Sequence, residues 1–186
     1  MTIDSSLNEA GHKMEAAVGH LKDELSSIRT GRATPAVLHR VTVEYYGTPV
    51  PLQQLASISI PEPRLLAVNA HDKNSVGAIE KAIRNSDLGL NPSSDGQVIR
   101  LNFPPLTADR RKDLVKLVKH MAEEGRVAVR NVRRSARHDL ESLEKDGDLS
   151  QDELQRAEKE LDKLTHAQEA EIDAALQHKE QELLED

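Results

Sequence analysis

The segment IRTGRATP, residues 28–35, ends the first helical pattern of the chain and decides how the rest can fold. Up to and including its first residue, apolar residues recur every three or four positions, the spacing of a narrow helical stripe. They are Leu7, Gly11, Met14, Val18, Leu21, Leu25 and Ile28. Gly31 frees the backbone, and Pro35 disfavours a helical Thr34. The first helix should therefore end here, and Ser6 and Glu9 have the spacing of a capping box near its start, although an earlier start stays open.

The period of the sequence changes from Val41 on, where short β-branched or alternating runs are separated by Gly and Pro. The runs read VTVEYY, GTPVPL, ASISI, RLLAVNA and, further on, VIRLNF. Such runs are typical of strands joined by turns. Residues 73–86 carry apolar side chains at helical spacing, and residues 87–96 are rich in turn residues. The sequence predicts a small domain with one helix against a sheet.

Two longer helical patterns follow the insert. Pro104 and Pro105 stiffen the backbone, and Thr107 can cap a new helix. The apolar positions of that helix are Leu114, Leu117, Met121, Gly125, Ala128, Val132, Ala136 and Leu143. After a break near residues 146–148, Ser150 and Glu153 form the capping box of a third helix of roughly 30 residues. Its apolar positions are Leu154, Ala157, Leu161, Leu164, Ile172, Ala175 and Leu183.

Three helices with one apolar seam each can bury those seams together only as a three-helix bundle. The chain leaves and re-enters the bundle at one end, so two linkers restrict the insert to hinge-like movement. We therefore expect an α+β protein, an elongated three-helix bundle with an inserted small β-rich α/β domain. The predicted bundle comprises residues 1–30 and 106–186, and the predicted insert comprises residues 31–105.

Composition excludes several classes of protein. Of the 186 residues, 37% are hydrophobic and 31% charged, which suits long helices with solvated faces better than one compact globule. There is no Cys, so disulfides, thiol nucleophiles and thiolate zinc sites are excluded. No apolar run approaches the roughly 20 residues of a membrane helix, and no signal peptide is apparent. We expect a cytoplasmic protein with no membrane partner.

Charge is distributed unevenly along a chain whose net charge is −7. Residues 108–137 hold ten Lys and Arg against four Asp and Glu, whereas residues 138–186 hold five against 17. The basic block includes RVAVRNVRRSARHDL, residues 126–140, with five Arg and no acidic residue between Arg126 and Arg137. The second helix is thus basic over its first part, and the third is strongly acidic.

Six basic residues of the second helix lie within about 30° of one direction, more than 90° from the apolar seam, at roughly 100° per residue. This basic stripe consists of Lys112, Lys119, Arg126, Arg130, Arg133 and Arg137. One interpretation is that these cations solvate the helix and pair with the acidic third helix. The other is that they bind a polyanion, because the planar fork of Arg grips phosphate. The absence of interleaved acids favours the second, since a face built for solubility usually mixes signs.

No group of residues has the pattern of a catalytic or metal site. His138 and Glu141, with Asp139 beside them, provide too few ligands for a metal ion. The segments GTPVP and DGQVI lack the glycine spacing and the lysine of a phosphate-binding loop. No Ser, His and Asp set stands out as a triad. We expect no enzyme, no cofactor and no metal.

Five long strings of this sequence, in order, are similar to the bacterial ribosome recycling factor family. They are IRTGRATP at 28–35, VEYYGTPVPLQQLA at 43–56, KAIRNSDLGLNP at 81–92, IRLNFPPLTADRRKDLVK at 99–116, and ARHDLE preceded by RVAVRNVRR. The resemblance implies an L-shaped, two-domain monomer that binds the 70S ribosome after termination. It also implies joint action with elongation factor G and GTP, which the partner hydrolyses, to split the ribosome into its subunits.

The resemblance further implies that the bundle lies on large-subunit ribosomal RNA at the subunit interface. Carried over by motif, the RNA-facing residues are Arg29, Arg32, Arg111, Arg130 and Arg133. Arg126 and Arg137 join them on stripe geometry alone, and Arg134 is the least certain arginine. An alternative function is that of a structural or adaptor coiled-coil protein whose basic stripe pairs with an acidic partner.

The two linkers form the predicted hinge. Its residues are Arg29, Thr30, Gly31, Arg32, Ala33, Thr34, Pro35, Phe103, Pro104, Pro105, Leu106 and Thr107. The small domain around Tyr45, Tyr46, Pro49 and Pro51 resembles the part that meets elongation factor G. Strand alternation predicts that one of the two tyrosines lies in the small core and the other outside.

Overall fold

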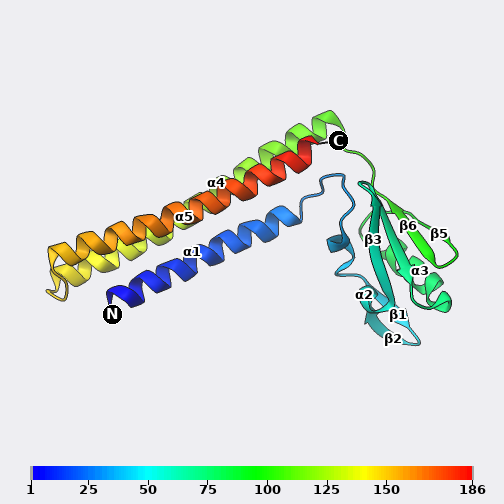
Figure 1. Cartoon of the computed structure of the whole chain (residues 1–186), viewed down its shortest axis with the longest axis horizontal. Helices are drawn as coiled ribbons and strands as arrows, with labels where there is room; N and C mark the ends of the chain where they lie inside the picture. The colour runs from blue at the N-terminus through cyan, green and yellow to red at the C-terminus, as the bar shows by residue number, and fades with distance from the viewer. Residues whose placement is uncertain (1, 186) are drawn as a thin grey trace. The chain divides into compact units, whose positions relative to one another are not determined.

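The computed structural model describes residues 2–185, which form two compact units (Figure 1). One unit is built from the two ends of the chain, Met1–Arg29 and Ala108–Asp186, and the other is Thr30–Thr107. The sequence-based division instead begins the insert at residue 31 and ends it at residue 105. The α+β class, with long helices packed as a bundle and an inserted β-sheet unit, is confirmed.

The first unit is a bundle of α1 (Ile3–Ser26), α4 (Ala108–Lys145) and α5 (Gln151–Leu184). Figure 1 shows that α1 begins at the end of the bundle where α4 turns into α5. The first helix therefore runs antiparallel to α4 and parallel to α5. The turn between α4 and α5 contains Gly147, whose φ of 82° is the left-handed conformation that favours glycine.

The helix caps were predicted with mixed success. The N-cap of α1 is Thr2, whose hydroxyl accepts a hydrogen bond from Ser5 N at 3.1 Å, so the capping box of Ser6 with Glu9 was wrong. Ser6 instead lies buried inside the helix. The capping box of α5 is confirmed: Ser150 Oγ accepts from Glu153 N at 3.2 Å, and Ser150 N donates to Glu153 Oε2 at 2.8 Å.

The seams of α1 and α5 follow the predicted positions closely. Their fully buried members that were predicted are Met14, Val18, Leu21, Leu25, Ala157, Leu161, Ile172 and Leu183. The remaining predicted positions, Leu7, Gly11, Ile28, Leu154, Leu164 and Ala175, are half-buried. Thr165 was not predicted, because it is polar; it is buried, and its hydroxyl donates to the carbonyl of Leu161 at 2.8 Å.

The buried face of α4 is rotated relative to the prediction. Leu117 was assigned to the seam but its side chain is 43% exposed, whereas Val118 is fully buried. Ala122, Val129 and Leu140 are buried as well. These residues are as apolar as the ones chosen, and α4 contacts both α1 and α5, so its buried face is wider than one stripe. The sequence could not fix the phase of that face.

At Gly125, α4 packs closely against both other helices of the bundle. A Cβ at this position would lie 2.9 Å from Leu21 Cδ2 on α1 and 3.6 Å from Ile172 Cδ1 on α5. Leu21 and Ile172 are both buried. The absent side chain of Gly125 therefore lets α4 approach both neighbours at once.

The small unit contains two antiparallel sheets. Strands β1 (Thr42–Tyr45) and β2 (Thr48–Pro51) form a hairpin, and a four-stranded sheet has the order β3-β4-β6-β5. Its strands are β3 (Ala56–Glu62), β4 (Leu65–Ala70), β5 (Pro92–Asp95) and β6 (Val98–Asn102). Strand β5 was missed, because its sequence, PSSD, has no apolar residue to alternate.

One longer helix and three short helical turns complete the small unit. They are α3 (Val76–Asn85), α2 (Leu52–Leu55), η1 (Pro35–Leu38) and η2 (Lys73–Ser75). The predicted helix against a sheet is present: Ile79 and Ile83 of α3 share a buried core with Val68 of β4 and Ile99 of β6. All members of this core lie between residues 33 and 101. The small unit thus has a core of its own.

Candidate nucleic-acid interface

The basic stripe of α4 lies along the border with α5, and five of its six residues are paired with acids of that helix. The pairs are Lys119 with Glu180, Arg126 with Asp173, Arg130 with Glu169, Arg133 with Asp162 and Arg137 with Glu158. Because α4 and α5 are antiparallel, the residue numbers fall along one helix as they rise along the other. The pairing of the stripe with the acidic third helix, one of the two interpretations of the sequence, is therefore present.

The arginines of the stripe differ in how far they are covered. The side chain of Arg126 is 21% exposed, and Nε donates to Asp173 Oδ1 at 3.2 Å while Nη1 donates to Glu123 Oε2 at 3.1 Å. The hydrogen bond to Asp173 raises the pKa of this guanidinium above its ordinary value. The side chains of Arg130, Arg133 and Arg137 are 47%, 39% and 53% exposed. The expectation of an exposed stripe thus fits these three and is wrong for Arg126, which acids of two elements enclose.

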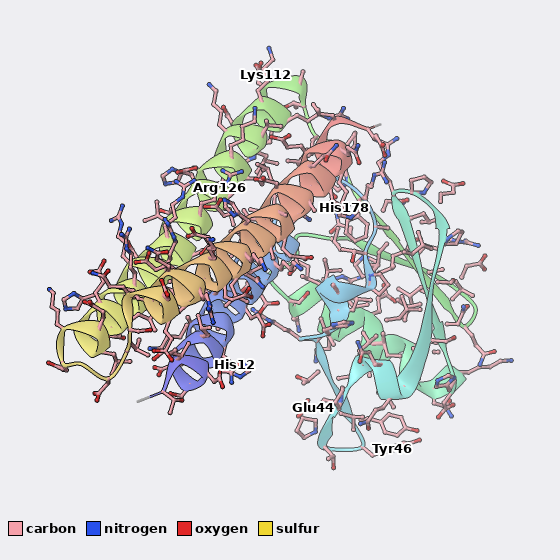
Figure 2. All side chains as sticks on the ribbon, turned by 60° about the vertical axis from the view of Figure 1, so that its left-hand side comes forward. His12, Glu44, Tyr46, Lys112, Arg126 and His178 are labelled. Carbon is pink, nitrogen blue, oxygen red and sulfur yellow. The ribbon has the colours of Figure 1, made fainter. Side chains whose placement is uncertain are left out.

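Lys112 and Arg134 are among the basic residues of α4 that lie outside this row of pairs. Lys112, near the start of α4, and Arg134 are exposed, and neither has an ion pair with any residue between 2 and 185. Figure 2 shows Lys112 and Arg126 projecting from the same helix. Arg134, the arginine that the sequence left least certain, is therefore available to an anion without displacing a carboxylate.

Three further predicted arginines lie near the ends of the elements. Arg29 follows the end of α1 and is exposed, and Arg111 is half-buried in the first turn of α4. Both belong to the bundle unit, whereas Arg32, also half-buried, belongs to the small unit. The structure therefore divides the predicted RNA-facing arginines between the two units.

Part of the predicted hinge is hydrogen-bonded into the small unit. Ala33 N donates to the carbonyl of Pro63, and Phe103 N donates to the carbonyl of Arg64, both at 2.8 Å. Thr34 caps η1, because its hydroxyl accepts a hydrogen bond from Ala36 N at 3.3 Å. The predicted hinge residues outside these contacts are then mainly 29–32 and 104–107.

The two linkers touch each other at Gly31. Its φ is 78°, a conformation that L side chains rarely adopt, and a Cβ here would lie 3.4 Å from Leu106 Cγ. Leu106 and the carbonyl of Pro104 close this side of the backbone. A glycine is therefore required where the linkers cross.

The hairpin of β1 and β2 displays an exposed aromatic residue. Tyr46 is 80% exposed, with its ring at the tip of the small unit in Figure 2, which confirms that one tyrosine lies outside, whereas Tyr45 is half-buried and lies outside the buried core in which the other was expected. The rings meet edge to face, 4.5 Å apart. Burial, and next the Asp72 carboxylate that accepts the Tyr45 hydroxyl at 3.3 Å, raise the pKa of that phenol. Tyr45 thereby holds the hairpin against the rest of the small unit, beside the exposed ring of Tyr46.

The turn that carries Tyr46 is strained. Tyr46 and Gly47 have φ values of 50° and 78°, and they connect a two-residue hairpin in which Tyr45 pairs with Thr48. Positive φ at both central positions defines a type I′ turn, which favours Asn or Asp first and Gly second. A bulky aromatic at the first position is an outlier of the kind that clusters at functional sites.

Among residues 2–185, no group of three or more His, Asp or Glu side chains is placed to hold a metal ion, and no helix is long and apolar enough to cross a membrane.

The carboxylates of α5 were missed as part of this surface. Their positions, 158, 162, 169, 173 and 180, are separated by four and seven residues, which keeps them on one side of a helix. That spacing was visible in the sequence. Which neighbour it faces depends on the rotation of α4 against α5, which the sequence did not fix.

Fold and surface together define a class: a three-helix bundle with an inserted β-sheet unit and a row of arginines on the bundle. The family model for ribosome recycling factors matches residues 21–184. The chain is 55% identical to the ribosome-recycling factor of Acidothermus cellulolyticus and 53% identical to that of Saccharopolyspora erythraea, each over 98% of this chain and 99% of the relative. The chain belongs to the ribosome recycling factor family, whose members are translation factors and not enzymes.

Two solved structures agree with this assignment. The solution structure of a ribosome recycling factor has a TM-score of 0.80 and 43% identity, covering 99% of this chain and 98% of that one. A model of the T. thermophilus factor, bound with E. coli elongation factor G to the E. coli post-termination complex, has a TM-score of 0.68 and 49% identity over the whole of both chains.

Proposed function

We propose that this protein, together with elongation factor G and GTP, disassembles the post-termination ribosomal complex into subunits, so that ribosomes are recycled. The full-length similarity to a relative that was placed with elongation factor G on that complex carries the proposal. The chain contributes binding and mechanical coupling, and the partner hydrolyses the nucleotide.

In this proposal the bundle binds large-subunit ribosomal RNA through arginine contacts to phosphate. The candidate residues are Arg29, Arg32, Arg111, Arg126, Arg130, Arg133 and Arg137. Exposure supports Arg29, which is exposed, and three residues of the stripe whose side chains are 39% to 53% exposed, namely Arg130, Arg133 and Arg137. Arg126 is supported least. If about five phosphates are neutralised, the affinity should fall with salt at a log-log slope of very roughly −4.

The hinge of residues 29–35 and 103–107 lets the partner push the small unit, and the stiff bundle transmits the force. The exposed ring of Tyr46 on its strained turn supports the hairpin as the contact with elongation factor G. The adaptor alternative loses its main argument, since the acidic partner of the basic stripe lies within the chain.

The first test is subunit splitting of post-termination 70S ribosomes, followed by light scattering, with and without elongation factor G and GTP. Splitting that requires this protein, the partner and the nucleotide supports the proposal. A protein that binds ribosomes but never accelerates splitting would contradict it.

The second test addresses the arginines by co-sedimentation with purified large ribosomal subunits over a salt series. Arg133→Ala should weaken binding by about 1 to 3 kcal/mol, because it removes charge-assisted hydrogen bonds to phosphate. Melting should hardly change, because the partner Asp162 is 46% exposed and can be hydrated. Lys145→Ala, the same change of charge at the end of α4, is the control and should bind almost normally. Salt-independent affinity would refute the electrostatic part of the proposal.

A further inference from the structure

The pair between Arg133 and Asp162 uses only one edge of the guanidinium. Arg133 Nε donates to Asp162 Oδ1 at 2.8 Å, and Nη2 lies 2.8 Å from the same oxygen. Nε and the adjacent Nη2 hydrogen form the side-on edge of the group. Its end-on edge, Nη1 and the outer hydrogen of Nη2, has no hydrogen bond to any residue from 2 to 185. The carboxylate thus fixes the guanidinium and leaves open the fork that can bind a phosphate bidentately.

Arg126 provides the opposite case on the same helix. Asp173 accepts from Nε and Nη2, and Glu123 accepts from Nη1, so both edges are engaged. Arg126 can reach a phosphate only by breaking one of these contacts. The pairing pattern therefore separates an arginine that joins two helices from one that is held ready for an external anion.

Two opposing effects decide what Asp162 does to anion binding. Its charge repels a phosphate, but 46% of its side chain is exposed and solvent screens charges of that kind. Against this stands the conformational entropy of a free arginine, which has many rotamers and loses them on binding. Asp162 restricts that freedom in the unbound protein, because it holds Arg133 at 2.8 Å, and this ordering effect favours binding while the repulsion it opposes is screened.

We propose that Asp162 is a positioning residue for RNA binding: it holds Arg133 by the side-on edge and so directs the end-on edge to a backbone phosphate. The inference rests on the proposed function, since it needs the stripe to bind ribosomal RNA. The proposal gives an acidic side chain a favourable role in RNA binding. Judged by its charge alone, Asp162 would oppose that binding.

The experiment compares two variants of α5 that lose the same charge. Asp162→Ala frees Arg133, whereas Glu171→Ala frees Lys22 of α1, whose Nζ lies 2.8 Å from Glu171 Oε2 and is not part of the stripe. Affinity for purified large ribosomal subunits is measured at fixed salt. Asp162→Ala should weaken binding about 3- to 10-fold, and Glu171→Ala should leave it unchanged or slightly tighter. Asp162→Asn should retain most of the affinity that Asp162→Ala loses, because its amide oxygen still accepts a hydrogen bond from Arg133 Nε.

A double-mutant cycle separates positioning from a structural effect. In the Arg133→Ala background, Asp162→Ala should cause no further loss, because there is no guanidinium left to orient. Circular dichroism checks that helicity is equal in all variants.

The outcomes distinguish the two proposals. If Arg133→Ala binds like the unchanged protein, the RNA-binding role of the stripe fails. If Arg133→Ala binds weakly but Asp162→Ala binds equally well or more tightly, the stripe stands and the positioning role is overturned, because Asp162 then competes with phosphate. An equal loss from Asp162→Ala in both backgrounds also overturns it.

Discussion

The two units of the chain display their candidate contact residues by different means. In the bundle, flexible arginine side chains on α4 are held by carboxylates of α5. In the small unit, the backbone conformation positions the contact residue, since a turn with two positive φ values places the Tyr46 ring in solvent. The charged surface can therefore be altered by single substitutions on a neighbouring helix, whereas the aromatic display depends on the conformation of one turn.

The largest expected effect is the unfolding of the small unit while the bundle stays folded. Leu66 of β4 is fully buried in the core of the small unit, so Leu66→Ala should cost about 2 to 5 kcal/mol and unfold much of that unit. The bundle has its own core, so far-UV circular dichroism should retain the α-helical signal. Co-sedimentation with large subunits should persist while splitting with elongation factor G is lost.

Leu140→Ala, at a fully buried position of α4, is the reciprocal control and should lower the melting of the helices instead. If either variant melts both units in one transition with the same midpoint, the units are not independent.

A smaller effect concerns the packing of the bundle. Gly125→Ala gains about 1 kcal/mol of helix propensity but forces a Cβ to within 2.9 Å of Leu21 Cδ2, and overpacking typically costs about 1 to 3 kcal/mol. We expect a net loss of up to about 2 kcal/mol, seen as a lower melting temperature. Gly19→Ala in α1 is the matched control and should raise the melting temperature, because the new Cβ would meet no atom of residues 2–185 within 4 Å apart from its own stretch of helix. Equal stabilisation by both changes would show that the Leu21 side chain moves away from the new Cβ at no measurable cost in stability.

The turn at Tyr46 should trade stability against function. Tyr46→Asn places the favoured residue at the first position of a type I′ turn and should raise stability by about 0.5 kcal/mol. The same change removes the exposed ring, so splitting with elongation factor G should slow while affinity for the large subunit stays the same. Denaturant unfolding and light scattering measure the two effects. A variant that splits ribosomes at the normal rate would remove Tyr46 from the proposed contact.

The smallest effect is a dependence on acid at the start of α5. Hydrogen bonds from the backbone and side chain of Ser150 lower the pKa of Glu153 from its ordinary value of 4.5. Because the pKa is lower in the folded chain, this stabilisation is fully present above about pH 4.5 and is lost as the pH falls through the folded value. The melting temperature of Glu153→Gln should therefore change less between pH 7 and pH 3 than that of the unchanged protein. Parallel pH profiles would count against the capping role.

Much of the fold could be predicted because its signals are long and regular. The spacing of three and four residues extends over three long segments, and the prolines around residue 104 mark the return to the bundle. The phase of α4 was wrong at Leu117 and Val118, because neighbouring apolar residues offer several equivalent stripes. Strand β5 was missed because it is stabilised by pairing with β6, and its own polar sequence carries no strand pattern that would predict this pairing.

The candidate site, like the fold, could be predicted in part. The helix period put Lys119, Arg126, Arg130, Arg133 and Arg137 on one face, and all five pair with α5, but the period did not show that this face borders α5. For that reason two features were not expected: the enclosure of Arg126, and the exposed side chain of Arg134, which has no ion pair within the described part of the chain. Both depend on how two helices are rotated against each other, and such a rotation is decided by packing between residues far apart in the chain.

The insertion of one unit inside the other also fixes an order of events during synthesis. The core of the small unit comes from a continuous segment between residues 33 and 101, whereas α1 must wait for α4 and α5 before it can bury Met14, Val18 and Leu21. Domains generally fold as units while the chain emerges. The small unit should thus reach its native state first, with α1 still exposed, and protease treatment of nascent chains halted near residue 145 should find it already resistant.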